Sequence, residues 1–288
     1  MRSRKLITTL SLTAVMLAMM TVPAMAYTID GDLDDWGINL SEDWSVKETW
    51  VPSSSTADWI VEDNIDPRWS SSYTGVHIKG HGALYDDYEE LKIIAWNGGE
   101  YISPSGGEHY DIEAMYFDSD ASNAYFAIVT SYSEYGMGDL AIDIAGEKYG
   151  IVLQDPESGT SKGQIYHNPS WNDPNQYQFP ANGPYRITGG TLNGIGSVAY
   201  VNSGIPDYSY SNYIIEISAP RTALGSPSNG DVSKLHTTIW CGNDVIEIEQ
   251  VTWEEIPEFS TIAIPVGMIF GLFYFYRRKR QSREEKAK

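Results

Sequence analysis

Short β-rich runs, separated by clusters of Gly, Pro, Asn, Asp and Ser, recur through most of this chain and limit the folds open to it. Alternation with a period of two residues, bounded by turn residues, is typical of β-strands. Between residues 27 and 256, no stretch of about twelve residues or more combines helical periodicity with helix caps. The pattern predicts an all-β sandwich with at most one short helical turn, near Pro220–Leu224. The predicted strands are VHIK (76–79), LKIIAW (91–96), YDIEAMYF (110–117), NAYFAIVTS (123–131), DLAIDI (139–144), KYGIVL (148–153), SVAYV (197–201), YIIEIS (213–218), LHTTIWC (235–241) and VIEIEQ (244–249).

Two segments, 39–72 and 154–184, have the composition of long loops throughout. Neither has the monotonous composition of a spacer, and the chain shows no internal repeat. We therefore interpret both as elaborations of one domain, residues 27–256. A division into two domains near 154–184 is the alternative.

The first 26 residues have the organisation of a secretory signal peptide. Three basic residues precede an apolar stretch from Leu6 to about Val22, and the small-x-small triplet Ala24-Met25-Ala26 follows. This order predicts cleavage before Tyr27 and export of the residues that follow. An uncleaved N-terminal anchor is the alternative.

The C-terminal end combines a short motif, a membrane-length apolar run and a basic cluster. Pro257, Glu258 and Phe259 lead into an uncharged run that ends at Tyr276. As a helix this run spans roughly 27 Å, close to the hydrocarbon thickness of a bilayer. A stop-transfer cluster follows it, and the positive-inside bias holds that cluster and the tail 281–288 in the cytoplasm. The cluster is Arg277, Arg278, Lys279 and Arg280.

These three parts in this order, together with a signal peptide, resemble the PEF-CTERM sorting signal of archaeal surface proteins, over residues 257–280. The resemblance implies that a membrane-embedded, transpeptidase-like archaeosortase recognises the motif, removes the hydrophobic tail and transfers the protein to a lipid or another anchor. It places the protein at the cell surface, anchored at its C terminus. A simple transmembrane anchor is the alternative.

The charge of the outside domain is strongly negative. Three of the 19 Lys and Arg residues lie in the signal peptide and seven at or after Arg277, which leaves nine. Three of the 39 Asp and Glu residues lie beyond Pro257, which leaves 36, so the formal charge outside is −27. Such a surface repels phosphate backbones and excludes nucleic acid as a partner. It favours divalent cations.

A single cysteine, Cys241, rules out an internal disulfide, so we expect the exported domain to be stabilised by core burial, with a bound metal ion as a further contribution. Cys241 lies in the strand-like run LHTTIWC, which predicts a small buried apolar role for it. Asn39 begins the N-glycosylation sequon Asn-Leu-Ser, a modification that fits an exported loop.

Carboxylates with the spacing of calcium ligands open the outside domain, in IDGDLDDW at 29–36. Asp30, Asp32 and Asp34 alternate as in a calcium loop, where carboxylates converge on one hard cation. The EF-hand pattern then fails, because Asp35 occupies its glycine position and Ser41 its final glutamate position. A purely structural turn at the start of the domain is the alternative.

A second group of carboxylates lies on the predicted strand YDIEAMYF. Strand parity places Asp111, Glu113, Met115 and Phe117 on one face. Carboxylates in such a position are solvated, paired or bound to a cation, and the loop at 62–66 supplies further oxygens. The seven residues predicted to bind Ca²⁺ are Asp30, Asp32, Asp34, Asp63, Asp66, Asp111 and Glu113, with a solvated acidic rim as the alternative.

The opening IDGDLDDW also resembles the start of family 9 carbohydrate-binding modules and related DOMON-like sandwiches. YDIEAMYFDSDASNAYFAIVTS, DLAIDI and IEISAPRTALG resemble later elements of that superfamily, in the same order. The resemblance implies a jelly-roll or DOMON-like β-sandwich in which the tryptophan of the opening motif packs inward.

All nine Trp residues lie outside, and several fall in or beside the 39–72 segment. Trp faces stack on sugar rings while neighbouring polar groups reach the hydroxyls, so the sequence predicts a glycan as ligand. The predicted contacts are Trp44, Trp50, Trp59 and Trp69. Structural anchoring of the loops is the alternative role for each of them.

No motif predicts an enzyme. Gly159-Thr160-Ser161-Lys162-Gly163 fits the G-x-S-x-G spacing but lies in a polar loop with no following helix. Glycines flank His81, so His77 and His81 do not have the setting of a helical zinc pair. We therefore expect a non-catalytic, glycan-binding surface module. The alternatives are a structural or adhesive envelope protein without a small ligand, and an extracellular glycoside hydrolase, which requires only two suitably spaced carboxylates.

Overall fold

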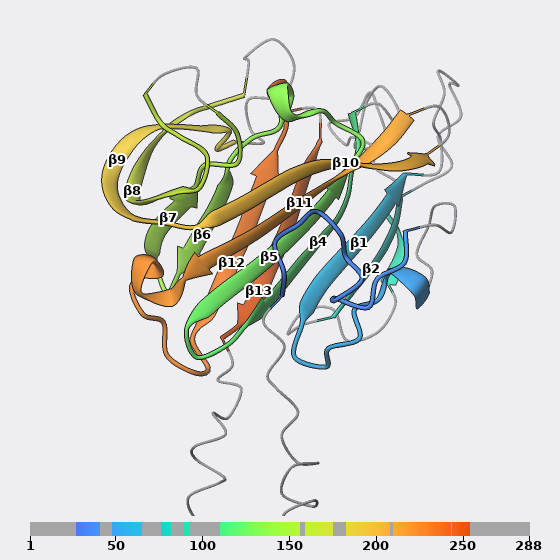
Figure 1. The fold of residues 1–288 in the computed structure, drawn as a ribbon, viewed down its shortest axis with the longest axis horizontal. Helices are drawn as coiled ribbons and strands as arrows, with labels where there is room; N and C mark the ends of the chain where they lie inside the picture. Colours follow the sequence, from blue (N-terminus) through green and yellow to red (C-terminus); the bar gives the residue numbers. More distant parts are fainter. Residues whose placement is uncertain are drawn as a thin grey trace, which may run out of the picture. The chain divides into compact units, whose positions relative to one another are not determined.

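The structure, a computed structural model, describes residues 27–40, 48–64, 76–81, 89–92, 110–155, 159–174, 183–207, 210–242 and 244–253. These residues form two antiparallel β-sheets (Figure 1). The first sheet contains β1 (Asp58–Asn64), β2 (Val76–His81), β3 (Glu89–Lys92), β4 (Ile112–Ser119), β5 (Asn123–Thr130), β10 (Ser197–Asp207) and β11 (Tyr210–Pro220). The second contains β6 (Leu140–Ile144), β7 (Glu147–Ile151), β8 (Gln164–Asn172), β9 (Arg186–Ile195), β12 (Val232–Thr238) and β13 (Val245–Thr252).

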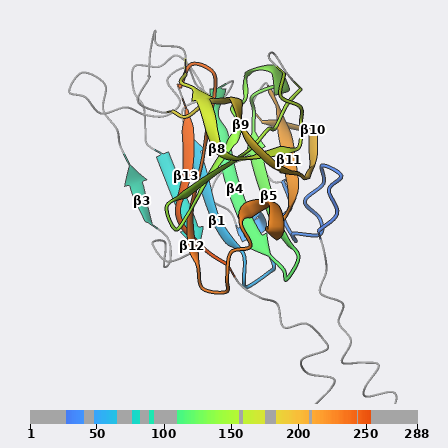
Figure 2. The same ribbon diagram turned by 90° about the vertical axis from the view of Figure 1, so that its left-hand side faces the viewer.

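The seven-stranded sheet has the order β10-β11-β5-β4-β1-β2-β3, and Figure 2 shows it from β3 at one edge to β10 at the other. The six-stranded sheet has the order β13-β12-β6-β7-β8-β9. Three short 3-10 helices occur in the described residues: η1 (Glu48–Trp50), η3 (Glu134–Gly136) and η5 (Arg221–Leu224). The all-β prediction is confirmed, and η5 is the helical turn that the sequence predicted near Pro220–Leu224.

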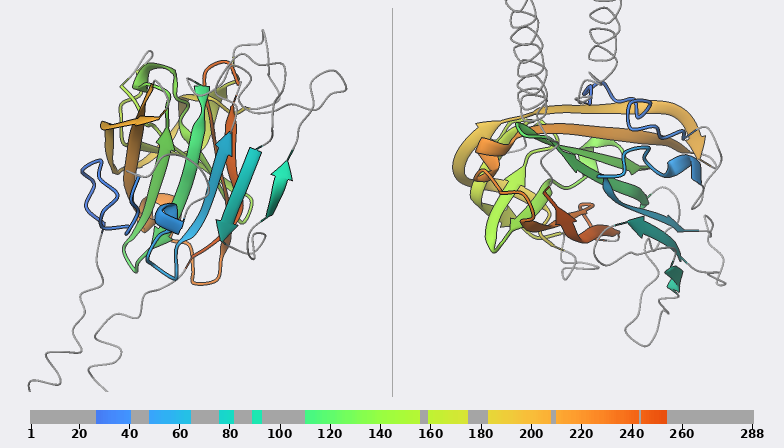
Figure 3. Two further views of the ribbon diagram at one scale, coloured as in Figure 1. Left: turned by 90° about the vertical axis from the view of Figure 1, so that its right-hand side faces the viewer. Right: turned by 90° about the horizontal axis from the view of Figure 1, so that it is seen from below.

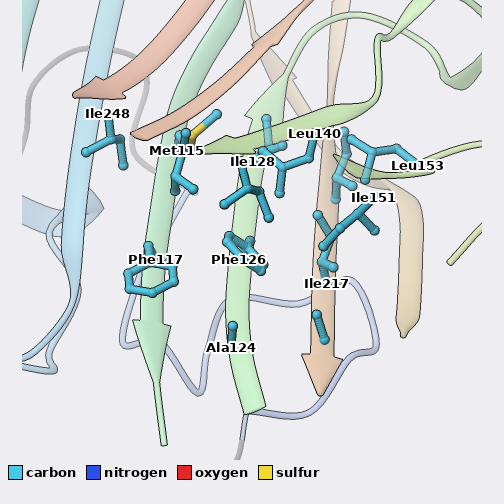
Figure 4. Close-up of a cluster of buried hydrophobic side chains, with 14 of the residues drawn as sticks. Met115, Phe117, Ala124, Phe126, Ile128, Leu140, Ile151, Leu153, Ile217 and Ile248 are labelled. Carbon is cyan, nitrogen blue, oxygen red and sulfur yellow. The ribbon is translucent and has the colours of Figure 1, made fainter. Parts of the chain in front are cut away.

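The main core lies between the two sheets (Figure 4). Met115 and Phe117 of β4 meet apolar side chains of the opposite sheet there, such as Leu140 and Ile248. Ile215 and Ile217 of β11 extend the same layer. Alternate residues of each strand point into this layer, which is the reason the chain shows period-two patterning.

A second core covers the outer face of the seven-stranded sheet. Residues 27–40 and η1 lie on this face (Figure 3, right), and their Leu33, Trp36 and Trp50 are buried against β4 and β5. As a result every residue of β4 is buried, since the strand is covered on both faces.

Two segments interpreted as loops contain strands, which corrects the sequence analysis. β1 lies in the 39–72 segment, and its Trp59, Ile60 and Val61 are consecutive because both faces of the sheet are buried. β8 lies in the 154–184 segment, where Asn168 has a positive φ of 48° and Pro169 interrupts the strand pattern. Strands on both sides of residues 154–184 belong to the same six-stranded sheet.

A bulge at the start of β4 changes the parity expected there. Ile112 pairs with Thr130 and Ala114 with Val129, so two residues of β4 oppose one of β5. The extra residue turns Ile112 into the main core, beside Met115 and Phe117, whereas simple alternation placed it on the other face. Ala114 lies on the outer face, as alternation predicts.

Candidate functional site

The opening motif forms a compact turn whose carboxylates bind backbone amides. Asp30 Oδ1 accepts a hydrogen bond from the Asp32 amide, and Asp32 Oδ1 accepts one from the Asp34 amide, each at 3.0 Å. All three side chains are exposed. Within the described residues, no group of three or more His, Cys, Asp and Glu side chains is placed to hold a metal ion. This geometry fits the structural turn that the sequence analysis kept as the alternative.

A buried carboxylate fixes this turn to the sheet. Glu216 Oε2 accepts hydrogen bonds from the amides of Asp30 and Gly31, at 3.1 and 2.7 Å, and its Oε1 accepts one from Trp36 Nε1 at 3.1 Å. Burial raises the pKa of Glu216 to about 7, although these hydrogen bonds favour the ionised form. Tyr27 stacks on Trp36 with ring centroids 3.9 Å apart.

The other predicted calcium ligands are placed differently. Asp111 and Glu113 are 1% and 2% exposed, so solvation does not account for these carboxylates. Burial and the charge of the Glu113 carboxylate raise the pKa of Tyr116. Asp63 lies on β1, opposite His77 of β2, and nothing is described of its side chain. Asp66 lies outside the described residues.

The two predicted glycan contacts that the structure describes are buried and form no open aromatic face. Trp50 and Trp59 are 2% and 6% exposed and pack in the second core, so their rings serve to bury the outer face of the sheet. Trp44 and Trp69 lie outside the described residues. Asn39 is exposed, as a glycosylation acceptor must be.

A groove of about 540 Å³ lies instead on the outer face of the six-stranded sheet. It has an aromatic wall, a row of charged side chains and a short wall of irregular chain. Its lining residues come from β6, β7, β8, β12, β13 and the segment before β9. They are Ala141, Ile142, Asp143, Lys148, Tyr149, Asn168, Pro169, Trp171, Gly183, Pro184, Lys234, His236 and Glu247.

The aromatic wall of the groove is Trp171 of β8. Its half-buried indole packs beside Val152, Tyr166 and Ile187. Gly150 of β7 lies beneath it, and a Cβ at that position would come within 2.9 Å of two indole carbons. Glycine at 150 is therefore required for the indole to lie close against the strand.

The charged row crosses four strands with alternating sign. Lys148 pairs with Asp143. Lys234 Nζ lies 2.8 Å from Glu247 Oε2 and 2.9 Å from Glu249 Oε1. Asp143 is the register partner of both Lys148 and Lys234, so opposite charges face one another across β7, β6 and β12. Cross-strand pairs of this kind stabilise a sheet modestly and hold their side chains in place.

His236 completes the row. Its Nδ1 lies 2.7 Å from Glu247 Oε1 and its Nε2 lies 3.2 Å from the Pro184 carbonyl oxygen. The ring is therefore held between a carboxylate and a backbone carbonyl oxygen, both of which are hydrogen-bond acceptors. Burial raises the pKa of Glu247, but the hydrogen bonds from His236 and Lys234 outweigh it and lower the pKa to about 2. The hydrogen bond from Lys148 lowers the pKa of Asp143.

The irregular wall, Gly183–Pro184, is held by a buried carboxylate at the start of β6. Asp139 Oδ2 accepts a hydrogen bond from the Ile187 amide at 2.8 Å, and its Oδ1 accepts one from the Leu153 amide at 3.0 Å. The Asp139 amide donates to the Tyr185 carbonyl at 2.8 Å. Burial raises the pKa of Asp139 to about 6.

The sequence analysis missed this groove. It treated Trp171 as one tryptophan of a loop, because Asn168 and Pro169 obscure β8. The available signal was weak: VSKLHTT places Lys234 and His236 at alternate positions, and LAIDI places Asp143 between two isoleucines, which marks the solvent-facing side of each strand. Nothing in that signal shows which strands are neighbours.

The described residues thus form an all-β fold that carries a surface groove with an aromatic wall and a row of ion pairs. Residues 256–280 match the model of the PEF-CTERM archaeal protein sorting domain. No curated protein and no solved structure matches the chain. The match confirms the predicted sorting signal, which implies an exported, membrane-anchored surface protein and a substrate for archaeosortase processing.

The predicted signal peptide and the predicted C-terminal helix both lie outside the described residues. In the part of the chain that the structure describes, no helix has the length and apolar character needed to cross a bilayer.

Proposed function

We propose that this protein displays a non-catalytic glycan-binding module on the outer face of the membrane, with the groove on the six-stranded sheet as its binding site. One observation carries the proposal: Trp171 forms the wall of a groove of about 540 Å³ whose other side is a row of fixed, charged hydrogen-bonding groups. The volume lies within the roughly 300–1,000 Å³ typical of small-ligand sites.

The arrangement has the two elements that recognition of a sugar requires. The apolar face of a pyranose ring stacks on an indole, while hydroxyl groups around its rim need donors and acceptors at fixed positions. Trp171 and Pro169 supply apolar surface, and Lys148 and Asp143 supply a donor and an acceptor beside it. Pairing across the strands preorganises these groups, so little side-chain entropy is lost on binding.

The electrostatics of the groove favour binding over hydrolysis. A glycoside hydrolase needs one carboxylic acid with a raised pKa as proton donor. The two carboxylates that line the groove, Asp143 and Glu247, both have lowered pKa values because each is hydrogen-bonded to a cation. This supports a binding module rather than the extracellular hydrolase.

The finer fold assignment, a jelly-roll or DOMON-like sandwich related to family 9 carbohydrate-binding modules, is part of the proposal. What supports it is the opening motif, whose Trp36 packs inward beside Glu216 as that resemblance implies. Calcium is also part of the proposal, with Asp111 and Glu113 as the better candidates, because both are buried and a carboxylate attracts a cation more strongly in a low-dielectric interior than in water.

An adhesive envelope protein without a small ligand is the second candidate. Tyr135 is 92% exposed and Trp240 is 42% exposed. The Trp240 amide donates to the Gly136 carbonyl oxygen at 2.9 Å, so both rings lie at the same end of the sheets. Exposed aromatic side chains of this kind suit contact with another protein.

Glycan-array binding by the full chain, purified in detergent, separates the two candidates. We expect reproducible binding that Trp171→Ala reduces by about tenfold or more, which is the loss of roughly 1.4 kcal/mol. Trp240→Ala is the matched control, an exposed tryptophan outside the groove, and leaves glycan binding unchanged. Binding that Trp240→Ala abolishes and Trp171→Ala spares contradicts the groove as the site.

A further inference from the structure

The lysines of the groove are unusual for this chain. Residues 27–256 contain nine Lys and Arg against 36 Asp and Glu, and two of those nine, Lys148 and Lys234, line one groove. Cations gathered in an acidic protein ordinarily indicate an anionic ligand. Both lysines are paired with carboxylates of the protein, however, so they do not indicate an anionic ligand here.

Each groove lysine is already neutralised by the protein. Lys148 pairs with Asp143, and Lys234 pairs with both Glu247 and Glu249. His236 lies beside them, with Nδ1 2.7 Å from Glu247 Oε1 and Nε2 3.2 Å from the Pro184 carbonyl oxygen. The two lysines pair with three carboxylates, so this group of ion pairs offers no excess positive charge that would attract an anion.

We infer that the groove takes an uncharged glycan, a chain of neutral hexopyranose units, and rejects uronates and sulfated sugars. This inference rests on the proposed function. A carboxylate or sulfate on the ligand would have to displace Asp143 or Glu247 from its cation and enter a domain of formal charge −27. The displaced carboxylate would then be left without its partner, which costs free energy.

A hydroxyl group avoids that conflict. It accepts a hydrogen bond from an ammonium and donates one to a carboxylate, so adjacent hydroxyls of one ring bridge a Lys–Asp pair without breaking it. The Lys148 and Asp143 side chains are 59% and 33% exposed, which leaves both open to such a ligand. Trp171, on the neighbouring strand β8, receives the apolar face of the ring.

The inference is tested by titrating the full chain, in detergent, with two sets of soluble polymers at low and high NaCl. The neutral set is mannan, β-glucan and galactan, and the anionic set is polygalacturonate and chondroitin sulfate. We expect binding from the neutral set with an affinity that salt leaves unchanged, and none from the anionic set. Anionic binding that weakens with salt overturns the inference and leaves glycan binding standing.

Asp143→Asn makes the test sharper, because it frees Lys148 without removing the lysine. We expect this variant to acquire polygalacturonate binding at low salt, stronger than the wild type by about tenfold or more. Asp32→Asn, an exposed carboxylate on the opening turn, removes the same charge elsewhere and gives no gain. If Asp143→Asn gains nothing, ion pairing is not what excludes anions and the inference fails. Absence of binding to both polymer sets overturns the proposed function itself.

Discussion

Trp36 Nε1 donates a hydrogen bond of 3.1 Å to Glu216 Oε1, which joins the first turn of the domain to a strand 180 residues later. The same carboxylate accepts hydrogen bonds from the backbone amides of Asp30 and Gly31. One buried side chain thus holds the segment that closes the second core. Tyr27, the residue that follows the predicted cleavage site, stacks on Trp36 and donates to Asp118 Oδ2 at 2.7 Å. The N-terminal end of the domain is therefore firmly packed.

Glu216 gives stability a specific pH dependence. Its pKa is raised from 4.5 to about 7 in the folded state. The folded state therefore keeps this proton while the unfolded state loses it, so the free energy of unfolding falls as pH rises from about 4.5 to about 7. The fall from this residue is about 3 kcal/mol at most. Denaturant unfolding of the wild type and of Glu216→Gln at several pH values measures this fall. We expect the free energy of unfolding of the variant to change less with pH.

The control for that profile is Glu147→Gln, an exposed carboxylate, which we expect to keep the wild-type slope. Parallel curves for the wild type and Glu216→Gln would show that another group carries the pH dependence.

Gly150→Ala should damage the groove selectively. The added Cβ would lie 2.7 Å from Ile187 Cδ1 and 2.9 Å from the Trp171 ring, so the indole must move. We expect a stability loss of about 1–3 kcal/mol and, on the proposed function, a loss of glycan affinity of about tenfold or more. Gly189→Ala is the matched control, because a Cβ there meets nothing within 4 Å. If Gly150→Ala binds glycan with unchanged affinity, Trp171 does not contact the ligand.

Chelation tests the proposed calcium. A site at Asp111 and Glu113 that is saturated at 100 times its Kd stabilises the fold by about 2.7 kcal/mol. We expect the Tm to fall in the presence of EGTA and to recover with added Ca²⁺. Asp111→Asn should show a lower Tm and no response to EGTA. If EGTA leaves the Tm of the wild type unchanged, calcium does not stabilise the fold.

The sorting signal predicts the covalent ends of the mature protein. We expect the intact mass of the natural product to correspond to a chain that begins at Tyr27 and ends near Pro257, with an added anchor. Replacing Pro257, Glu258 and Phe259 together with alanine should leave the C-terminal tail in place, because the processing enzyme reads this motif. A wild-type mass that includes Lys288 would favour the simple transmembrane anchor.

Parts of the fold followed from local pattern, and other parts did not. Strands whose one face is solvated, such as β6 with its alternating Leu140, Ile142 and Ile144, were predictable. β1 was not, because the main core buries one of its faces and the second core buries the other, which removes the alternation. The bulge at Ile112 also escaped prediction, since it arises from pairing with β5 rather than from the composition of β4.

The candidate site shows the same division. Trp50 and Trp59 carry no local mark that separates them from Trp171, yet the first two are buried and the third forms the groove wall. The difference comes from residues 27–40, which cover one sheet face, and from Gly150, which seats the indole on the other.

By itself the sequence determined the sorting signal of this protein and its all-β class. Sorting machinery recognises linear motifs, so the match at residues 256–280 can be found from the sequence alone. Strand periodicity is likewise a local property of the sequence. Only the tertiary structure decided which aromatic and charged residues meet. Lys148, Trp171 and Lys234 share a groove because β7, β8 and β12 lie in one sheet. Strand order is set by packing between distant segments, and no local pattern encodes it.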